Sequence, residues 1–501
     1  MTSIMNVDNN QPRRGILDAA GLYLLLAALL TGLLLNGGYF PTAKVLLSLL
    51  FIAAAAVELL AALVGRKTLV LPAPFWILAV LTGLGGVSII WSVSASDTVR
   101  ESLALAGLLA AFLVAASQLR HPGTPGKLAS WLAYSGAFVA AWGIVTYILR
   151  MAPYSGEVDG LLRAGSTLQY SNALSCFALM SLPVTGALHR QAAPGDRPLL
   201  ALGITLETAA VLLTFARFGY FALLLVVVYL VVAGRRRSAG RAAGLAAGTG
   251  LAVAVAAALS EEAGLALVGL AAVVAILGAA WMAQSFLEPP RTELCRDPRS
   301  STAHGCRRDS RAVAGAFAFV LPAAMVVFAD RSLRHIAWER FGAGLSPASL
   351  LPNRLDTFAG AVDAFRVRPL TGSGLGTFAI TFQRYAIASY TRFAHNLVLQ
   401  TAVDTGAIGA ALMTAFLIWA AALALRRLLA GAEPLCLAFA LTSLIFIAYN
   451  MFDWEWYSTA LAGWFVVAVA VTAGKTGDTL VPENLRRSIS PADPLSGRRR
   501  R

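Results

Sequence analysis

Long apolar runs follow one another along almost the whole chain, from Ile16 to Gly474, with short connections between them. A helix needs about 20 mostly apolar residues to cross the hydrocarbon core of a bilayer. Of the 501 residues, 13% are charged, which is about half the share found in soluble globular proteins. A chain of this composition cannot cover itself with a water-facing surface. The pattern therefore predicts an all-α fold, a polytopic transmembrane helical bundle.

The apolar runs predict about 12 to 14 membrane spans of the length that a bilayer requires. The seventh and eighth runs meet at Arg217, so a tight turn has to separate them. In chain order, the predicted spans are Ile16–Asn36, Lys44–Val64, Pro74–Trp91, Val99–Gln118, Leu128–Leu149, Ser171–Leu188, Pro198–Ala216, Arg217–Ala233, Ala242–Leu259, Ala263–Phe286, Ala312–Ala329, His395–Leu425, Pro434–Phe452 and Tyr457–Ala473.

The formal net charge of +14 is distributed unevenly between alternate connections. If the N-terminus is inside, the short inner connections carry 20 Lys and Arg residues and the short outer connections carry five. Cytoplasmic connections of membrane proteins carry such an excess of positive charge. We therefore expect a multi-pass protein of the cytoplasmic membrane with both termini in the cytoplasm. The basic charge is explained by topology, which argues against nucleic-acid binding.

One outer connection, residues 330–394, is much longer than the others. Connections of this length are usually either functional or disordered, and the mixed composition of this one favours a small folded cap. The chain then divides into residues 1–329 with about 11 spans, the extracytoplasmic cap at 330–394, C-terminal spans at 395–474 and a basic cytoplasmic tail at 475–501.

The cap is expected to contain short helices. Four of its apolar residues fall on one helical face: Leu355, Phe358, Val362 and Phe365. They follow Pro352, and proline is typical of helix starts. The sequence therefore predicts a helix within a small folded cap on the outer surface.

The cysteines do not predict a metal site. Cys176 and Cys436 lie inside apolar runs and are expected to be small core residues. Cys295 and Cys306 flank His304 in a basic connection, with a spacing that fits no zinc pattern.

Ionisable residues inside or at the edge of a span are functional candidates by default, because they are costly to place in lipid. Glu207 and Asp404 lie within predicted spans, and Arg217 lies at the outer end of one. Asp453 and Glu455 lie in the last outer turn. An Arg at this depth can also simply extend its charged end to the membrane surface.

A second group of candidates lies in the cap and directly after it. Arg354 and Arg368 could bind phosphate oxygens, because a guanidinium group matches them in a planar, bidentate way. His395 begins a span at the same boundary, and an imidazole can accept a hydroxyl proton near neutral pH. Gly374 and Gly376 belong to a glycine-rich stretch that could equally be a flexible turn. Taken singly, each of these residues also has a purely structural explanation.

Taken together, these motifs resemble the O-antigen ligase and polymerase family of polytopic membrane glycosyltransferases. The resemblance is strongest over residues 353–409, and the Leu-Thr-x-x-Arg stretch that ends at Arg217 is similar to a second family motif. Ala216 and Asp404 depart from the residues that are common there, Ser and Glu, which leaves the subfamily open. The motif residues of the strongest region are Arg354, Arg368–Gly376, Ala394-His395-Asn396, Leu399-Gln400, Asp404-Thr405-Gly406 and Ile408-Gly409.

The resemblance implies a GT-C-like membrane fold and a specific chemistry. Such enzymes move a glycan from an undecaprenyl-diphosphate carrier to an acceptor hydroxyl of a lipid or glycan, without a metal or other cofactor. His395 would be the catalytic base. Arg217, Arg354 and Arg368 would bind the donor diphosphate. The supporting residues would be Asn396, Asp404, Gly374 and Gly376.

Two other classes of protein remain as alternatives. A lipid-linked oligosaccharide flippase or transporter would also have many spans, but such folds are built from internal repeats, and none is visible in the sequence. A membrane scaffold without chemistry would not require a His beside several Arg residues. The enzyme hypothesis further predicts that His395, Arg217 and Arg354 converge on one site.

Overall fold

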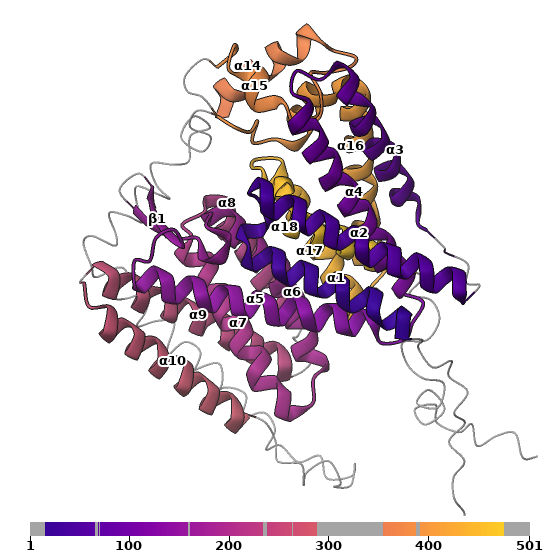
Figure 1. Ribbon diagram of the computed structural model, residues 1–501. Helices are drawn as coiled ribbons and strands as arrows, with labels where there is room; N and C mark the ends of the chain where they lie inside the picture. The colour runs from indigo at the N-terminus through magenta and orange to yellow at the C-terminus, as the bar shows by residue number, and fades with distance from the viewer. Residues whose placement is uncertain are drawn as a thin grey trace, which may run out of the picture.

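The computed structural model describes residues 16–65, 69, 71–158, 161–233, 238–262, 264–287, 354–386 and 391–474. In this part of the chain almost all residues are helical, and six helices are long and apolar enough to cross a membrane. The predicted all-α polytopic helical fold is thereby confirmed (Figure 1).

The helices coincide with the predicted spans to within a few residues. The first ten are α1 Ile16–Leu34, α2 Pro41–Val64, α3 Ala73–Val87, α4 Ala95–Gln118, α5 Thr124–Ile148, α6 Ser171–Gln191, α7 Arg197–Leu213, α8 Arg217–Ala233, α9 Ser238–Glu262 and α10 Ala266–Leu287. The later ones are α14 Arg354–Val367, α15 Phe378–Phe382, α16 Leu397–Leu429, α17 Pro434–Asn450 and α18 Thr459–Ala473. Short 3₁₀ turns are η1 Asn36–Gly38, η2 Ser88–Trp91, η3 Ser166–Leu168, η4 Pro194–Asp196 and η7 Glu455–Tyr457.

Some predicted features fall outside the described residues. These are the span Ala312–Ala329, the first part of the cap up to residue 353, and the group formed by Cys295, His304 and Cys306. Cys176 and Cys436 are described, and both are buried as expected.

Two helices, α6 and α18, form the centre of the bundle. Every residue of α18 from Thr459 to Thr472 is buried, as is every residue of α6 from Ala173 to Ala187. Helices that are covered on all sides lie inside a bundle rather than at its surface. α6 packs against α5, α7 and α17, and α18 packs against α4 and α17. The N-terminal ends of both central helices are therefore held rigidly by their neighbours.

A small hairpin that was not predicted lies between α5 and α6. Its strands are β1 Ser155–Val158 and β2 Leu161–Ala164, antiparallel, with Ser155 opposite Ala164. The strands are too short to produce an alternating pattern that stands out in the sequence. The hairpin packs against α5, α6 and α7.

Helix α16 is broken at Gly406, where the backbone has φ 70° and ψ −170°. The preceding connection fills the break: the backbone N–H of Ser373 donates to the carbonyl of Val403 at 3.0 Å, and that of Gly374 to Asp404 at 2.8 Å. On the other side of the break, the N–H of Ala407 donates to the carbonyl of Pro369 at 2.7 Å. A break in a membrane helix persists only where other protein groups satisfy its backbone.

The cap helix α14 forms as predicted, and the face that it buries consists of small residues. Leu355 is 53% exposed, and the buried residues are Thr357, Gly360, Ala361 and Ala364. A Cβ at Gly360 would touch the carbonyl of Tyr385, so small residues are needed for α14 to approach this closely. Close packing of small residues, rather than burial of the large apolar ones, decides the orientation of the helix.

The break in α16 generates a prediction about stability. Gly406→Ala should lower the free energy of unfolding by on the order of 3 kcal/mol, because the backbone conformation is suited to glycine and the new Cβ would overlap the Leu370 carbonyl. The measurement is the melting temperature of the purified protein in detergent. Gly83→Ala in α3 is the control, because a Cβ added there would meet no atom within 4 Å. Equal melting temperatures for the two variants would contradict the prediction.

Candidate active site

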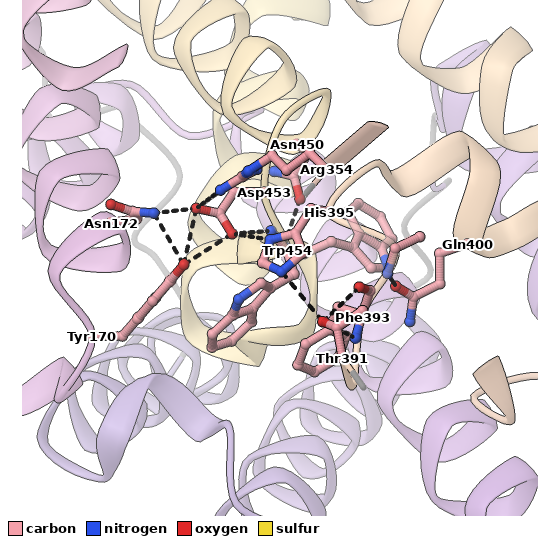
Figure 2. Close-up of polar contacts among 12 residues, drawn as sticks. Tyr170, Asn172, Arg354, Thr391, Phe393, His395, Gln400, Asn450, Asp453 and Trp454 are labelled. Carbon is pink, nitrogen blue, oxygen red and sulfur yellow. Dashed lines mark hydrogen bonds and ion pairs between the residues drawn. The ribbon is translucent and has the colours of Figure 1, made fainter. Parts of the chain in front are cut away.

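The centre of the candidate site is the carboxylate of Asp453, in the connection between α17 and α18. This residue is 4% exposed. A buried carboxylate is tolerated only when it is paired and hydrogen-bonded. Five groups approach it (Figure 2): the Tyr170 hydroxyl, the Asn172 amide, the His395 ring, the Arg354 guanidinium and the backbone N–H of Trp454.

His395 directs its ring at this carboxylate. Its Nδ1 lies 3.0 Å from Oδ1 of Asp453. A carboxylate can only accept, so Nδ1 carries the proton of this hydrogen bond and, in the neutral ring, Nε2 is left as the acceptor. Asn396 follows as the N-cap of α16, where its side-chain oxygen accepts from the N–H of Leu399 at 3.0 Å.

The backbone of His395 is unusual, with φ at 52°. Non-glycine residues adopt this left-handed conformation at a cost, and they concentrate at functional sites. Asn396 helps to hold the conformation, because its side-chain N–H₂ donates to the carbonyl of Met451 at 3.1 Å. The other ring nitrogen, Nε2, makes only a long contact, 3.5 Å, with the hydroxyl of Thr391.

Arg354 is the first residue of α14, and it brings a positive charge to the same carboxylate. Its Nη2 lies 3.7 Å from Oδ2 of Asp453. Its Nη1 is shielded from solvent and has no hydrogen-bond partner within the described part of the chain. An unsatisfied cationic donor next to a polarised imidazole could bind an anionic substrate oxygen.

Tyr170 and Asn172, at the start of α6, complete the carboxylate's surroundings. The Tyr170 hydroxyl donates to both carboxylate oxygens of Asp453, each at 3.0 Å, and it accepts from the Asn172 amide at 3.0 Å. The Tyr170 ring stacks on Trp454 with 4.5 Å between ring centroids, and Trp454 stacks on Phe393 at 4.7 Å. The aromatic layer fixes the tyrosine ring from which the hydroxyl donates.

The surroundings shift the pKa values of the two carboxyl groups between α17 and α18 in opposite directions. Burial would raise the pKa of Asp453, but the hydrogen bond from His395 and the charge of Arg354 outweigh burial and leave the pKa below its ordinary value. Burial, together with the negative charge of Asp453, raises the pKa of Glu455 well above its ordinary value. The charged form is therefore favoured at Asp453 and disfavoured at Glu455.

The structure brings two of the predicted site residues together at Asp453 and binds four others, described below, in contacts elsewhere. His395 and Arg354 meet at Asp453. Arg217 begins α8, and the next residue, Phe218, packs against Phe452 at 6.1 Å between ring centroids.

Arg368 is exposed, and its guanidinium donates to the carbonyl of Trp91 at 3.3 Å. Asp404, Gly374 and Gly376 belong to the junction at the break in α16, where Oδ2 of Asp404 accepts from the N–H of Gly376 at 3.0 Å. These four residues are bound in contacts away from the carboxylate of Asp453.

Glu207, in the middle of α7, is fully buried and accepts from Ser181 and Thr185 of α6. It takes no part in the contacts of Asp453.

Three members of the cluster could not be assigned from the sequence. Asp453 stands out there only as an ionisable residue of the last outer turn, without a link to the site. Tyr170 carries no signal in the sequence, and Asn172 belongs to the stretch Gly165-Ser166-Thr167 with Ser171-Asn172, which resembles a third, weaker motif of the family. The available signal for Asp453 is an acidic residue in a short turn between two apolar runs, where lipid-exposed charge is costly.

The comparison with protein families agrees with the motifs. Residues 251–414 match the family model described as O-antigen ligase. This match supports an O-antigen ligase-like family. It also supports glycan transfer of the ligase or polymerase kind in polysaccharide biosynthesis. Among curated proteins, none matches the chain.

The matched region includes Arg354 and His395 but ends before Asp453. The carboxylate and its partners on α6 therefore lie in parts of the chain outside the family match. In the residues that the structure describes, no group of three or more His, Cys, Asp and Glu side chains could hold a metal ion.

The raised pKa of Glu455 generates a prediction about pH and stability. Because its pKa is raised in the folded state, it destabilises the fold progressively as pH rises above its unfolded value of about 4.3, by up to about 1.4 kcal/mol per pH unit until the folded pKa is reached. Glu455→Gln removes this titration. The melting temperature of the variant, relative to wild type, should therefore rise between pH 5 and pH 8. A difference that stays constant over this range would show that the residue does not titrate as described.

Proposed function

We propose that the protein transfers a glycan from an undecaprenyl-diphosphate carrier to an acceptor hydroxyl of a lipid or another glycan, at the outer face of the cytoplasmic membrane. The observation that carries the proposal is the His395–Asp453 pair with the Arg354 guanidinium beside it. The pair supplies a base, and the guanidinium supplies a binding group for a diphosphate. The family match supports the same class of reaction.

The base acts through Nε2 of His395. The acceptor hydroxyl gives its proton to Nε2, while its oxygen forms a bond to the anomeric carbon of the donor glycan. The bond between that carbon and the diphosphate oxygen breaks, and its electron pair leaves with the diphosphate. Asp453 is a positioning group that keeps the proton on Nδ1 and stabilises the imidazolium ring that forms.

The leaving diphosphate gains negative charge as the bond breaks. Cationic donors that are already in place stabilise this charge without reorganisation. Arg354 offers a partly buried guanidinium with an unsatisfied Nη1, and Arg217, at the N-terminus of α8, is the second proposed ligand. Two guanidinium groups of this kind would perform the role that a metal ion has in other transferases, which makes the proposed transfer metal-independent.

The placement at the outer face follows from the proposed topology. The cluster lies at the N-terminal ends of α6 and α18 and before the N-terminus of α16. With the N-terminus inside, all three ends face outward, opposite the basic connections. Both termini are then cytoplasmic.

The base role is tested by His395→Ala. We expect glycan transfer to fall by about 100-fold or more, the range over which general-base catalysis contributes. The measurement is transfer in membranes that contain the variant, with lipid-linked glycan extracted from cells that lack the protein. His121→Ala, at the turn between α4 and α5, is the control and should retain activity. Unchanged transfer by His395→Ala, at equal protein level, would remove the proposed mechanism.

The diphosphate role is tested by Arg354→Lys. A lysine keeps the charge but cannot reproduce the two-pronged donor geometry, so we expect a loss of transfer of about tenfold or more. Undecaprenyl diphosphate alone should also bind more weakly to the purified variant. Arg366→Lys is a matched control on the same helix, because Arg366 is 72% exposed and pairs with Asp363. Equal binding by both variants would exclude Arg354 as a ligand.

A further inference from the structure

We propose that Arg163 is a positioning residue. Through Asn172, it holds the His395–Asp453 pair in a fixed position relative to the turn that carries Arg217. The inference rests on the proposed function, because it assigns the base and the diphosphate ligand to these two places. Arg163 itself lies on β2. Its effect on the pair would be transmitted through the groups that it binds.

The guanidinium of Arg163 bridges two elements. Its Nε donates to the carbonyl of Thr214 at 2.6 Å, and its Nη2 donates to Oδ1 of Asn172 at 2.9 Å. The two acceptors lie 51 and 9 residues away along the chain. A guanidinium group is suited to this task because its donors have a fixed angular separation, so that placing one acceptor also places the other.

The first acceptor belongs to the turn between α7 and α8. Thr214 is the C-cap of α7, and the last carbonyls of a helix have no partner within the helix. Phe215 follows with φ at 49°, a left-handed conformation that a large side chain adopts at a cost. Arg217 then begins α8. Arg163 thus satisfies a carbonyl three residues before the proposed diphosphate ligand and stabilises the strained turn between them.

The second acceptor is the side-chain amide of Asn172, which the contact with Arg163 holds in one of its two orientations. Asn172 presents its oxygen to Arg163 and its N–H₂ group to Asp453. Arg163 can only donate and an ionised Asp453 can only accept, so the opposite orientation of the amide would break both hydrogen bonds. The Asn172 amide also donates to Tyr170, which in turn donates to Asp453. Arg163 therefore determines how two donors, the Asn172 amide and the Tyr170 hydroxyl, are oriented toward the carboxylate of Asp453, which binds His395.

The bridge matters because the base and the diphosphate ligand come from different parts of the chain. Transfer requires the acceptor oxygen, the anomeric carbon and the leaving oxygen to be aligned, and a displacement of about 1 Å can cost 100-fold in rate. The bridge links the turn that carries Arg217 to Asn172. Asn172 binds Asp453, which is the hydrogen-bond partner of His395. Loss of the bridge should impair turnover more than donor binding.

The first experiment compares Arg163→Lys with Arg427→Lys. Arg427 makes equivalent contacts at the opposite end of the bundle, donating to the carbonyls of Thr472 and Gly474 at 3.0 and 2.7 Å at the end of α18. We expect Arg163→Lys to lower kcat by about 10- to 100-fold with a donor KM within about threefold of wild type, and Arg427→Lys to leave kcat unchanged. The donor is the lipid-linked glycan extracted from cells that lack the protein.

Two outcomes would overturn the proposal. An increase in donor KM with kcat unchanged, together with weaker binding of undecaprenyl diphosphate, would show that Arg163 is itself a phosphate ligand. Wild-type kcat in Arg163→Lys, in an assay where His395→Ala is inactive, would show that the bridge is dispensable. If His395→Ala is active in the same assay, the proposed function fails first, so the two failures are distinguishable.

A second experiment tests the route through Asn172. If Arg163 acts through this amide, Arg163→Lys and Asn172→Ala should not be additive, and the double variant should have about the kcat of the weaker single variant. Multiplicative losses would overturn the proposed route.

Discussion

The buried charge of Asp453 constrains one end of the whole bundle. A carboxylate that is 4% exposed has to be compensated by donors and cations, or it would take up a proton instead. The compensating groups come from the start of α6, the start of α14 and the residue pair before α16. Four distant segments of the chain must therefore meet at one point. Their meeting places an imidazole and a guanidinium side by side, which is the arrangement a glycan transfer needs.

The same requirement explains the glycine-rich connection. In a membrane protein, every backbone group at a helix break needs a partner from the protein. The break at Gly406 exposes the carbonyls of Val403 and Asp404, and the connection that contains Gly374 supplies the N–H groups that satisfy them. The glycines allow the backbone of this connection to approach the backbone of α16 closely, so their role here is structural. This junction secures the first turns of α16, directly after His395.

Most of the helical architecture could be predicted from the sequence, because a bilayer demands a fixed length of apolar residues for each span. Arg354 and His395 could be predicted because they lie in local motifs. Asp453, Tyr170 and Asn172 could not, because their association is a tertiary contact between positions 281 or more residues apart. The face that α14 buries could not be predicted for a related reason. Leu355 and Phe358 stand out in the sequence because they are hydrophobic. The buried face instead contains Gly360, where the close approach of the Tyr385 backbone leaves no space for a side chain.

The location of Asp453 also determines what the matched family region can do by itself. His395 needs an acceptor at Nδ1 to leave Nε2 available for a hydroxyl proton, and that acceptor lies beyond residue 414, where the match ends. Asp453 in turn depends on the start of α6, well before residue 251. The proposed base therefore depends on the packing of the N-terminal helices, the cap and the last two helices against one another. In the proposed mechanism the bundle orients the reacting groups as well as anchoring them in the membrane.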